Sequence, residues 1–289
     1  MDLFTCAITL GVALNPISEG YIEYTTPSEQ QNYICYANLT DYQNFLGSAG
    51  LSLGLFNEFI YADGDFTGSK DYQHVTLNAG LQCKFKNFTP YAECTAVYLN
   101  EEKKPFSDED GRVNSFYSKE LYAKAGIKIT HQLIKNLDFF GDFSLGYDFI
   151  NEFGVNGEQY VESSSEWKDI SKKCTYLEDM FRANLMVGLK FFKVLSIYAG
   201  IQSWQTIGYS SDTGSIFGGS TPCMIRNDIG CEFKTNFKHL NPFVTAHYFC
   251  QHPEKPFDYY NKTQHPEEYL SEQFNYNHME IKAGLELKF

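Results

Sequence analysis

The most regular feature of the chain is an alternation of apolar and polar residues with a period of two, repeated from one end to the other. Between His74 and Phe85, every second residue from Val75 onward is apolar, and polar residues or glycine occupy the positions between them. A β-strand places these two sets on opposite faces, whereas a helix would mix them. The pattern therefore predicts extended strands with one apolar and one polar face.

The same alternation recurs within 121–130, 137–149, 181–191 and 226–234. Such runs are longer than the ~5–6 residues of an ordinary strand and fit the ~9–11 residues of a membrane-crossing strand. No apolar run approaches the ~18 residues of a spanning helix, but barrel strands bury only alternate residues. We expect about twelve strands, with ten or fourteen as alternatives because 20–39 is irregular. Their ranges are about 2–14, 20–39, 49–62, 73–86, 88–99, 116–131, 136–149, 178–192, 194–207, 224–235, 241–250 and 275–289.

The connections between these strands alternate in length. Short ones lie near 86–87, 134–136, 192–194 and 235–240, and long polar stretches lie at 63–72, 100–115, 150–177, 208–223 and 251–273. Short periplasmic turns on one rim and long extracellular loops on the other are typical of outer-membrane barrels. The sequence therefore predicts one all-β domain over 1–289, a closed antiparallel up-and-down transmembrane β-barrel.

The C-terminal strand supports this interpretation. One face is apolar and ends on an aromatic residue, through Ile281, Leu285, Leu287 and Phe289. This pattern resembles the C-terminal assembly signal of bacterial outer-membrane β-barrels of the porin or channel type, although no motif indicates one family among them. The resemblance implies a bacterial outer-membrane location, with the barrel-assembly machinery and outer-membrane lipid as partners.

The N-terminal segment 1–14 is apolar enough to be compared with a signal peptide. It has no basic n-region and no small-residue cleavage site before Asn15-Pro16, so we interpret it as a strand. An exported protein needs a signal peptide, and we expect one to have been removed from this numbering.

The charges divide between the strands and the loops. The net charge of −13 argues against a nucleic-acid partner, because phosphate backbones attract basic surfaces. In a barrel, the polar faces of the strands line the interior. Among the interior residues predicted below, with Lys288 added, acidic and basic residues are equal in number, so the excess negative charge falls in loops and turns. The predicted channel-lining residues are Glu58, His74, Lys84, Glu93, Lys124, Lys128, Asp138, Asp142, Asp148, Arg182, Lys190, Arg226, Asp228, Glu232, Lys234, Glu280, Lys282 and Glu286.

Aromatic residues are abundant, with 25 Phe and 21 Tyr. Several cluster near predicted strand ends, among them Phe85, Phe88 and Tyr91, and they predict aromatic girdles at the membrane interfaces. The packed core of a soluble barrel is the alternative.

Little in the sequence indicates catalysis or a cofactor. No local motif pairs His74, His131, His247 or His278 with a serine or an aspartate, so we expect no enzyme and no cofactor. The motif Gln-His-Pro-Glu occurs twice within 251–270, which makes His252 and His265 weak candidates for a transition-metal site. A solvated, proline-rich loop is the simpler interpretation.

Three functions follow from these observations. The first is a channel for passive diffusion of small hydrophilic solutes through a narrow lumen with balanced charges. The second is a non-conducting surface barrel whose acidic loops bind a partner, as an adhesin or receptor does. The third is an outer-membrane hydrolase with its site at the rim. Balanced interior charges fit both a hydrated pore and a closed, ion-paired interior, and a barrel of about twelve strands is between the filled and the open sizes.

Overall fold

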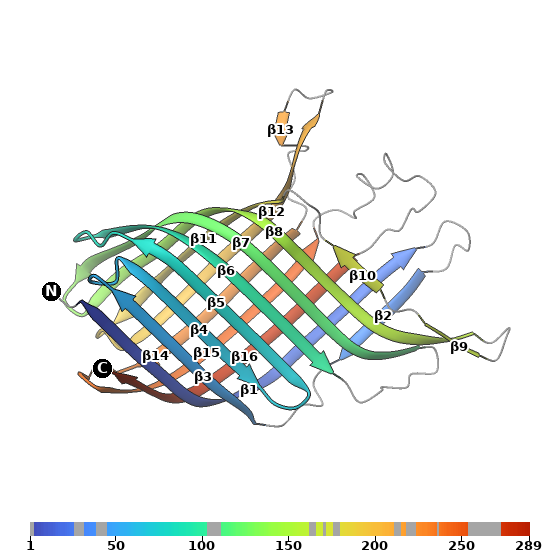
Figure 1. Ribbon diagram of the computed structural model, residues 1–289, viewed down its shortest axis with the longest axis horizontal. Helices are drawn as coiled ribbons and strands as arrows, with labels where there is room; N and C mark the ends of the chain where they lie inside the picture. Colours follow the sequence, from blue (N-terminus) through green and yellow to red (C-terminus); the bar gives the residue numbers. More distant parts are fainter. Residues whose placement is uncertain are drawn as a thin grey trace.

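The computed structural model is a closed β-barrel of 12 antiparallel strands (Figure 1). It describes residues 3–25, 32–38, 45–102, 111–161, 166–169, 172–175, 180–210, 215–217, 224–235, 237–253 and 273–289. The barrel strands are β1 (Phe4–Thr25), β3 (Leu46–Leu55), β4 (Ile60–Gly68), β5 (Tyr72–Gln82), β6 (Phe88–Glu102), β7 (Gly111–Ile134), β8 (Leu137–Val161), β11 (Met180–Phe191), β12 (Leu195–Ser210), β14 (Met224–Lys234), β15 (Leu240–Pro253) and β16 (Gln273–Lys288).

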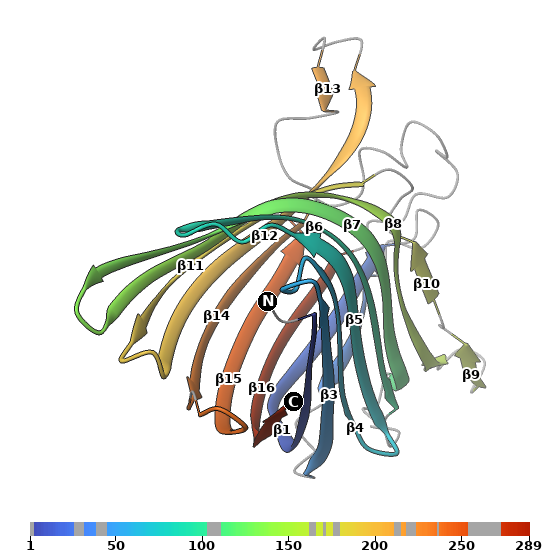
Figure 2. The same ribbon diagram turned by 60° about the vertical axis from the view of Figure 1, so that its left-hand side comes forward.

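Each barrel strand pairs with the next one along the chain, and β16 pairs with β1 to close the ring. Four short strands pair onto the ends of barrel strands at one rim: β2 (Asn32–Asn38) on β1, β9 (Glu166–Asp169) and β10 (Lys172–Thr175) on β8, and β13 (Ser215–Phe217) on β12. Figure 2 shows β13 and the end of β12 projecting away from the barrel. Closure satisfies the backbone hydrogen-bonding groups that hydrocarbon could not. The predicted fold class and strand number are confirmed.

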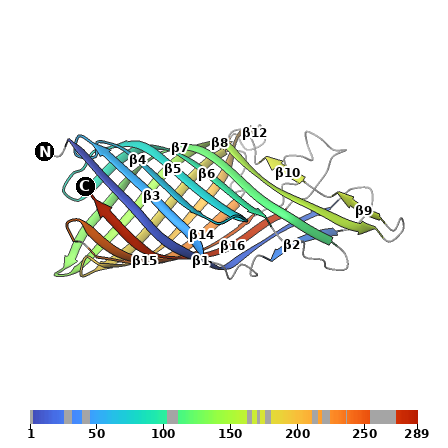
Figure 3. The ribbon, with the colours of Figure 1, turned by 60° about the horizontal axis from the view of Figure 1, so that its bottom comes forward.

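The two rims differ in the length of their connections. Short turns at 56–59, 83–87, 135–136 and 192–194, and the short connection between β14 and β15, lie at the rim that also holds both termini (Figures 1 and 3). The termini are fixed there by backbone hydrogen bonds from Phe56 N to Leu3 O (3.0 Å) and from Phe289 N to Cys6 O (2.9 Å). The opposite rim carries the longer connections, apart from a short one at 69–71. The expected sorting of short turns and long loops is confirmed at all but that connection.

Two predicted strands are wrong, and the two errors offset each other in the count. The range 20–39 is not a barrel strand, because β1 continues to Thr25 and β2 pairs back onto it, Tyr36 opposite Tyr21. The range 49–62 is two strands, β3 and β4, joined by a turn at 56–59. This turn contains three consecutive residues with φ of 55° to 59° but no glycine or proline to mark it in the sequence.

The faces of the barrel are inverted relative to a soluble protein. Large apolar side chains are exposed on every barrel strand, including Leu77 (54%), Leu185 (47%) and Ile229 (55%). Polar residues make up most of the buried set, including Thr95 (2%) and Asp148 (1%). A barrel that spans a bilayer needs this arrangement, with its apolar face toward lipid and its polar face inside.

The C-terminal residues of the predicted assembly signal follow the same rule. Leu285 (46%) and Phe289 (73%) are exposed, and Ile281 and Leu287 on the same face are partly exposed. Their recognition by the assembly machinery stays a prediction. Among the described residues, no helix is long and apolar enough to cross a membrane.

Candidate functional site: the barrel interior

The interior face carries most of the residues that the sequence placed there. Strand register aligns them in rows: Glu93 on β6 lies opposite Lys124 on β7, and Arg182 on β11 lies opposite Trp204 on β12. Glu58 and Lys84 are the exceptions, because they belong to rim connections, where they form an ion pair with each other. The predicted residues on the interior face are His74, Glu93, Lys124, Lys128, Asp138, Asp142, Asp148, Arg182, Lys190, Arg226, Asp228, Glu232, Lys234, Glu280, Lys282 and Glu286.

The most buried charges form a cluster around Arg182. Its guanidinium donates to both carboxylate oxygens of Asp148 (2.9 Å each) and to Glu120 Oε2 (2.7 Å). Trp204 Nε1 also donates to Asp148 (3.0 Å), and the guanidinium stacks over the Tyr122 ring at 3.7 Å. The Asp148 side chain is 0% exposed and the Arg182 side chain 6%. Bidentate and charge-assisted bonds of this kind fix side-chain geometry as well as charge, so this part of the wall is rigid.

A second cluster surrounds Glu93. Lys124 Nζ lies 3.0 Å from one carboxylate oxygen, and the Tyr61 hydroxyl donates to the other at 2.6 Å. Tyr91 donates to Asp142 at 2.7 Å, and its ring lies 4.7 Å from the Lys128 ammonium. The sequence placed Tyr91 in an interfacial girdle, and this is wrong: the residue is 5% exposed and its side chain lies inside the barrel.

Some interior contacts join strands that are not neighbours in the sheet. Lys282 on β16 reaches Asp65 on β4 (2.5 Å), across β1 and β3. His278 on β16 stacks with Tyr72 on β5, with ring centroids 6.3 Å apart and planes within 1°. The chain permits this because the inward residues of β1 and β3 are small, among them Gly11 and Gly50. Long side chains from β16 and β5 therefore cover the part of the inner wall that β1 and β3 form.

The opposite wall keeps an open cavity of about 480 Å³. Its lining comes from β8, β11, β12, β14 and β15 and mixes charged, amide, hydroxyl and aromatic groups. Asp228 accepts from Arg226 (2.8 Å) and bonds to His247 Nε2 (2.9 Å). The lining residues include Asp142, Asn184, Ser196, Tyr198, Gln202, Arg226, Asp228, Glu232, Thr245 and His247.

Sequence reasoning missed three interior carboxylates. Asp63 and Asp65 lie on β4, within a stretch that the sequence assigned to a loop. Glu120 lies on β7 and bonds to Arg182. Continuing the alternation of β7 backward from Tyr122 would have placed Glu120 inside, whereas Asp63 and Asp65 required the unmarked turn at 56–59.

The candidate chemistry of the histidines is limited. Within the described residues, the one hydrogen-bonding partner of the His247 ring is Asp228, so no nucleophile and base pair forms at this histidine. The placement of the His252 side chain and of His265 lies outside the described residues, and the metal prediction stays untested.

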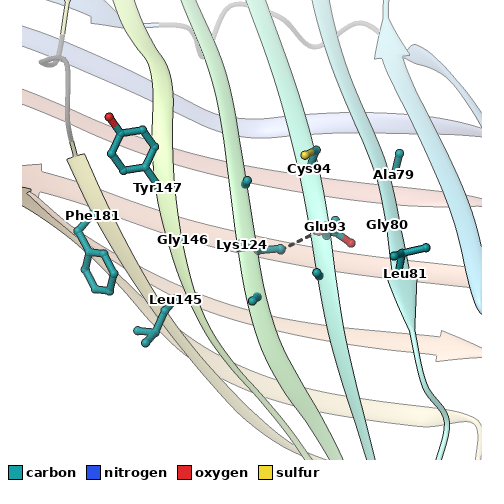
Figure 4. A pocket seen from close by; sticks show the side chains of 13 residues that line it. Ala79, Gly80, Leu81, Glu93, Cys94, Lys124, Leu145, Gly146, Tyr147 and Phe181 are labelled. Carbon is teal, nitrogen blue, oxygen red and sulfur yellow. Dashed lines mark ion pairs between the residues drawn. The ribbon is translucent and has the colours of Figure 1, made fainter.

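The outer wall has an open groove of about 590 Å³ over β5 to β8 and β11 (Figure 4). Small residues lie side by side at its floor, Ala79 beside Cys94 and Cys94 beside Ala123. Leu145, Tyr147 and Phe181 border it. The adjacent Glu93 and Lys124, whose ion pair is dashed in Figure 4, bond on the inner side of the sheet. The groove therefore belongs to the apolar outer surface.

Comparison with known proteins finds no matching family model and no matching curated protein. Among solved structures, this chain is similar to the Pseudomonas putida toluene transporter TodX, with 9% identity, 100% of this chain and 90% of that chain covered, and a TM-score of 0.42. It is also similar to KdgM porin (10% identity, 94% and 99% covered, TM-score 0.34) and to the Acinetobacter baumannii outer membrane protein Omp33 (10% identity, 97% and 99% covered, TM-score 0.33). The strand topology and the two faces define the class, a barrel of the outer-membrane type with a polar interior. No specific family within that class is identified.

Proposed function

We propose that the protein is a channel of the bacterial outer membrane through which small hydrophilic solutes diffuse passively. The observation that carries this proposal is a polar cavity of about 480 Å³ inside a barrel whose outer surface is apolar. A solute in such a lumen exchanges part of its hydration for contacts with fixed polar groups, while the sheet separates it from lipid. Most interior charges are already paired with one another, so a solute can enter without having to neutralise them.

Single-channel recording in planar bilayers tests the proposal. Folded protein should give discrete current steps of uniform size. Folding is established beforehand by the change in gel migration on boiling in detergent. Protein that passes this control and gives no steps would remove the channel.

Two neighbouring residues on β15 provide a matched pair of variants. Thr245 lines the cavity, and Val244 faces outward with 48% of its surface exposed. Thr245→Trp should lower the step size by roughly twofold or more, because a large ring narrows the pore. Val244→Trp adds the same ring outside and should leave the step size unchanged. Equal step sizes in both variants would mean that the current does not pass through this cavity.

The contacts between non-neighbouring strands favour a second candidate, a non-conducting barrel whose loops bind a partner. Lys282 with Asp65 and His278 with Tyr72 cover part of the lumen. The same recordings separate the two candidates, since the second predicts silence from folded protein.

A further inference from the structure

The cavity differs from the rest of the interior in its charge. Three carboxylates line it, Asp142, Asp228 and Glu232, against one guanidinium, Arg226. Several charges elsewhere in the interior form ion pairs, as Glu93 and Lys124 do. A local excess of negative charge around a water-accessible cavity attracts cations more strongly than the surrounding wall does.

The three carboxylates are not equally available. Arg226 (2.8 Å) and His247 (2.9 Å) both bond to Oδ1 of Asp228, so the one guanidinium that lines the cavity is already paired. Asp142 accepts from a neutral group, the Tyr91 hydroxyl. The Glu232 carboxylate makes no hydrogen bond or ion pair with any other described residue.

Two basic residues near these carboxylates have contacts elsewhere. Lys234, two positions beyond Glu232 on β14, forms an ion pair with Glu286. Lys128 lies opposite Asp142 across the β7–β8 pair, and its ammonium sits over the Tyr91 ring at 4.7 Å. Lys190 is in the same row as Glu232, two strands away with Ser196 between them, but it is not part of the cavity lining and no ion pair joins the two. Among the described residues, the Glu232 carboxylate therefore lines the cavity without an ion-pair partner.

Neutral hydrogen-bonding groups complete the lining. Ser196 is 7% exposed, lines the cavity, and its hydroxyl has no partner among the described residues. Asn184 and Gln202 present amides to the same space, and Tyr198 presents an aromatic ring. The hydroxyl of Ser196 faces the cavity, where a solute that bonds to it takes the place of water.

We propose that this cavity binds small organic cations of the primary-amine class. The ammonium group pairs with Glu232, Asp142 adds a second negative charge elsewhere in the cavity lining, and the rest of the solute bonds to neutral groups of the lining such as Ser196 and Gln202. The inference rests on the proposed channel, because it treats the lumen as accessible to solutes and names the class that the lumen favours.

Calorimetric titration of the folded protein in detergent tests the class without requiring conduction. Three probes share a four-carbon chain and differ in the charge of their end groups: putrescine is cationic, butane-1,4-diol is neutral and succinate is anionic. Putrescine should bind at least ~10-fold more tightly than either of the others, because one charge contact in a partly desolvated site accounts for a difference of that size. Equal binding of the diol would show a site for neutral polyols and overturn the proposal, as would the absence of putrescine binding.

A pair of variants locates the binding charge. Glu232→Gln keeps the side-chain volume and should weaken putrescine binding by about 10-fold. Asp63→Asn removes an interior charge on β4, outside the cavity lining, and should change binding by less than about twofold. Equal losses in the two variants would mean a diffuse attraction by the lumen, and the assigned site would be wrong. If Glu232→Gln fails the gel-shift control for folding, Asp142→Asn takes its place.

The outcome is separable from that of the proposed channel. Current steps without putrescine binding would support the proposed channel and contradict the proposed amine site. Putrescine binding without current steps would leave the site and remove the channel.

Discussion

At the scale of single residues, the interior is organised by how its buried charges are compensated. A buried ion pair contributes little net stability relative to apolar packing, but removal of one partner leaves an uncompensated charge and is strongly destabilising. Arg182 is such a partner for two acids, because it forms two bonds to Asp148 and one to Glu120. The cluster therefore depends on Arg182 more than on any one of its acids.

Arg182→Met tests this dependence. The substitution keeps an unbranched side chain of similar length but removes the cation that pairs with the fully buried carboxylate of Asp148. We expect the free energy of unfolding to fall by about 3–5 kcal/mol, measured by urea titration of the protein folded in lipid vesicles. Lys119→Met is the control, because the Lys119–Glu152 pair is half exposed at the lysine (51%), and its loss should cost less than ~1 kcal/mol. Equal costs for both variants would contradict the account of the Arg182 cluster.

The sequence predicted which face of the sheet these residues occupy, but it did not predict their partners. Alternation alone places Arg182 and Asp148 inside, since a period of two fixes the face of each residue once the strand is known. The pairing of Lys282 with Asp65 joins residues far apart in the sequence and depends on the small residues of the strands between them. Side-chain length and barrel curvature decide such contacts, and neither follows from the pattern of one strand.

At the scale of strands, inward glycines hold aromatic rings flat against the wall. A Cβ added at Gly230 would lie 2.3 Å from the Tyr198 ring, one at Gly188 would lie 2.4 Å from the Phe140 ring, and one at Gly80 would lie 2.9 Å from the Tyr61 hydroxyl. Each of these rings comes from the neighbouring strand and lies over the glycine. The glycines therefore place rings along the wall, and they keep these rings from projecting into the lumen.

Gly230→Ala tests this packing. The added methyl group must displace the Tyr198 ring, so we expect a loss of ~1–3 kcal/mol in the free energy of unfolding, the usual cost of overpacking. Urea titration in vesicles measures it. Gly200→Ala is the control on the same wall, because its methyl group meets no atom closer than 3.3 Å and no ring, and it should cost less. A larger loss in Gly200→Ala would contradict the proposed role of Gly230.

The strands themselves were predicted where the sequence marks their ends. The turns after β7 and β11 lie where the apolar alternation breaks, and both were expected. The turn at 56–59 was missed because Phe56, Asn57 and Glu58 adopt left-handed φ angles without a glycine. Phe192 and Lys193 have the same conformation, so tertiary pairing of the strands imposes these turns against local preference.

At the scale of the whole molecule, stability depends on which solvent meets each face. The outer wall exposes a large apolar residue on every barrel strand, and the inner wall buries charges in pairs. Water on both sides would leave the outer wall unfavourably hydrated, and hydrocarbon on both sides would leave the inner charges uncompensated. The fold is consistent only with lipid outside and polar groups or water inside.

Two adjacent positions of β5 test this division directly. Leu77 is 54% exposed on the outer wall, and Asn78 faces inward opposite Asp63. Leu77→Arg places a guanidinium in hydrocarbon and should cost about 2–4 kcal/mol when the protein is folded in vesicles. Asn78→Arg places the same group beside a carboxylate and should cost less than ~1 kcal/mol.

Urea titration in vesicles measures both costs, and the gel-shift on boiling reports the folded fraction. The ratio of the two effects is the informative quantity, because a general intolerance of arginine on β5 would destabilise both variants alike. If Leu77→Arg folds as well as the unmodified protein, the outer wall does not meet hydrocarbon. The lumen would then have no membrane to cross, and neither solute passage nor amine binding within a pore would follow from the geometry.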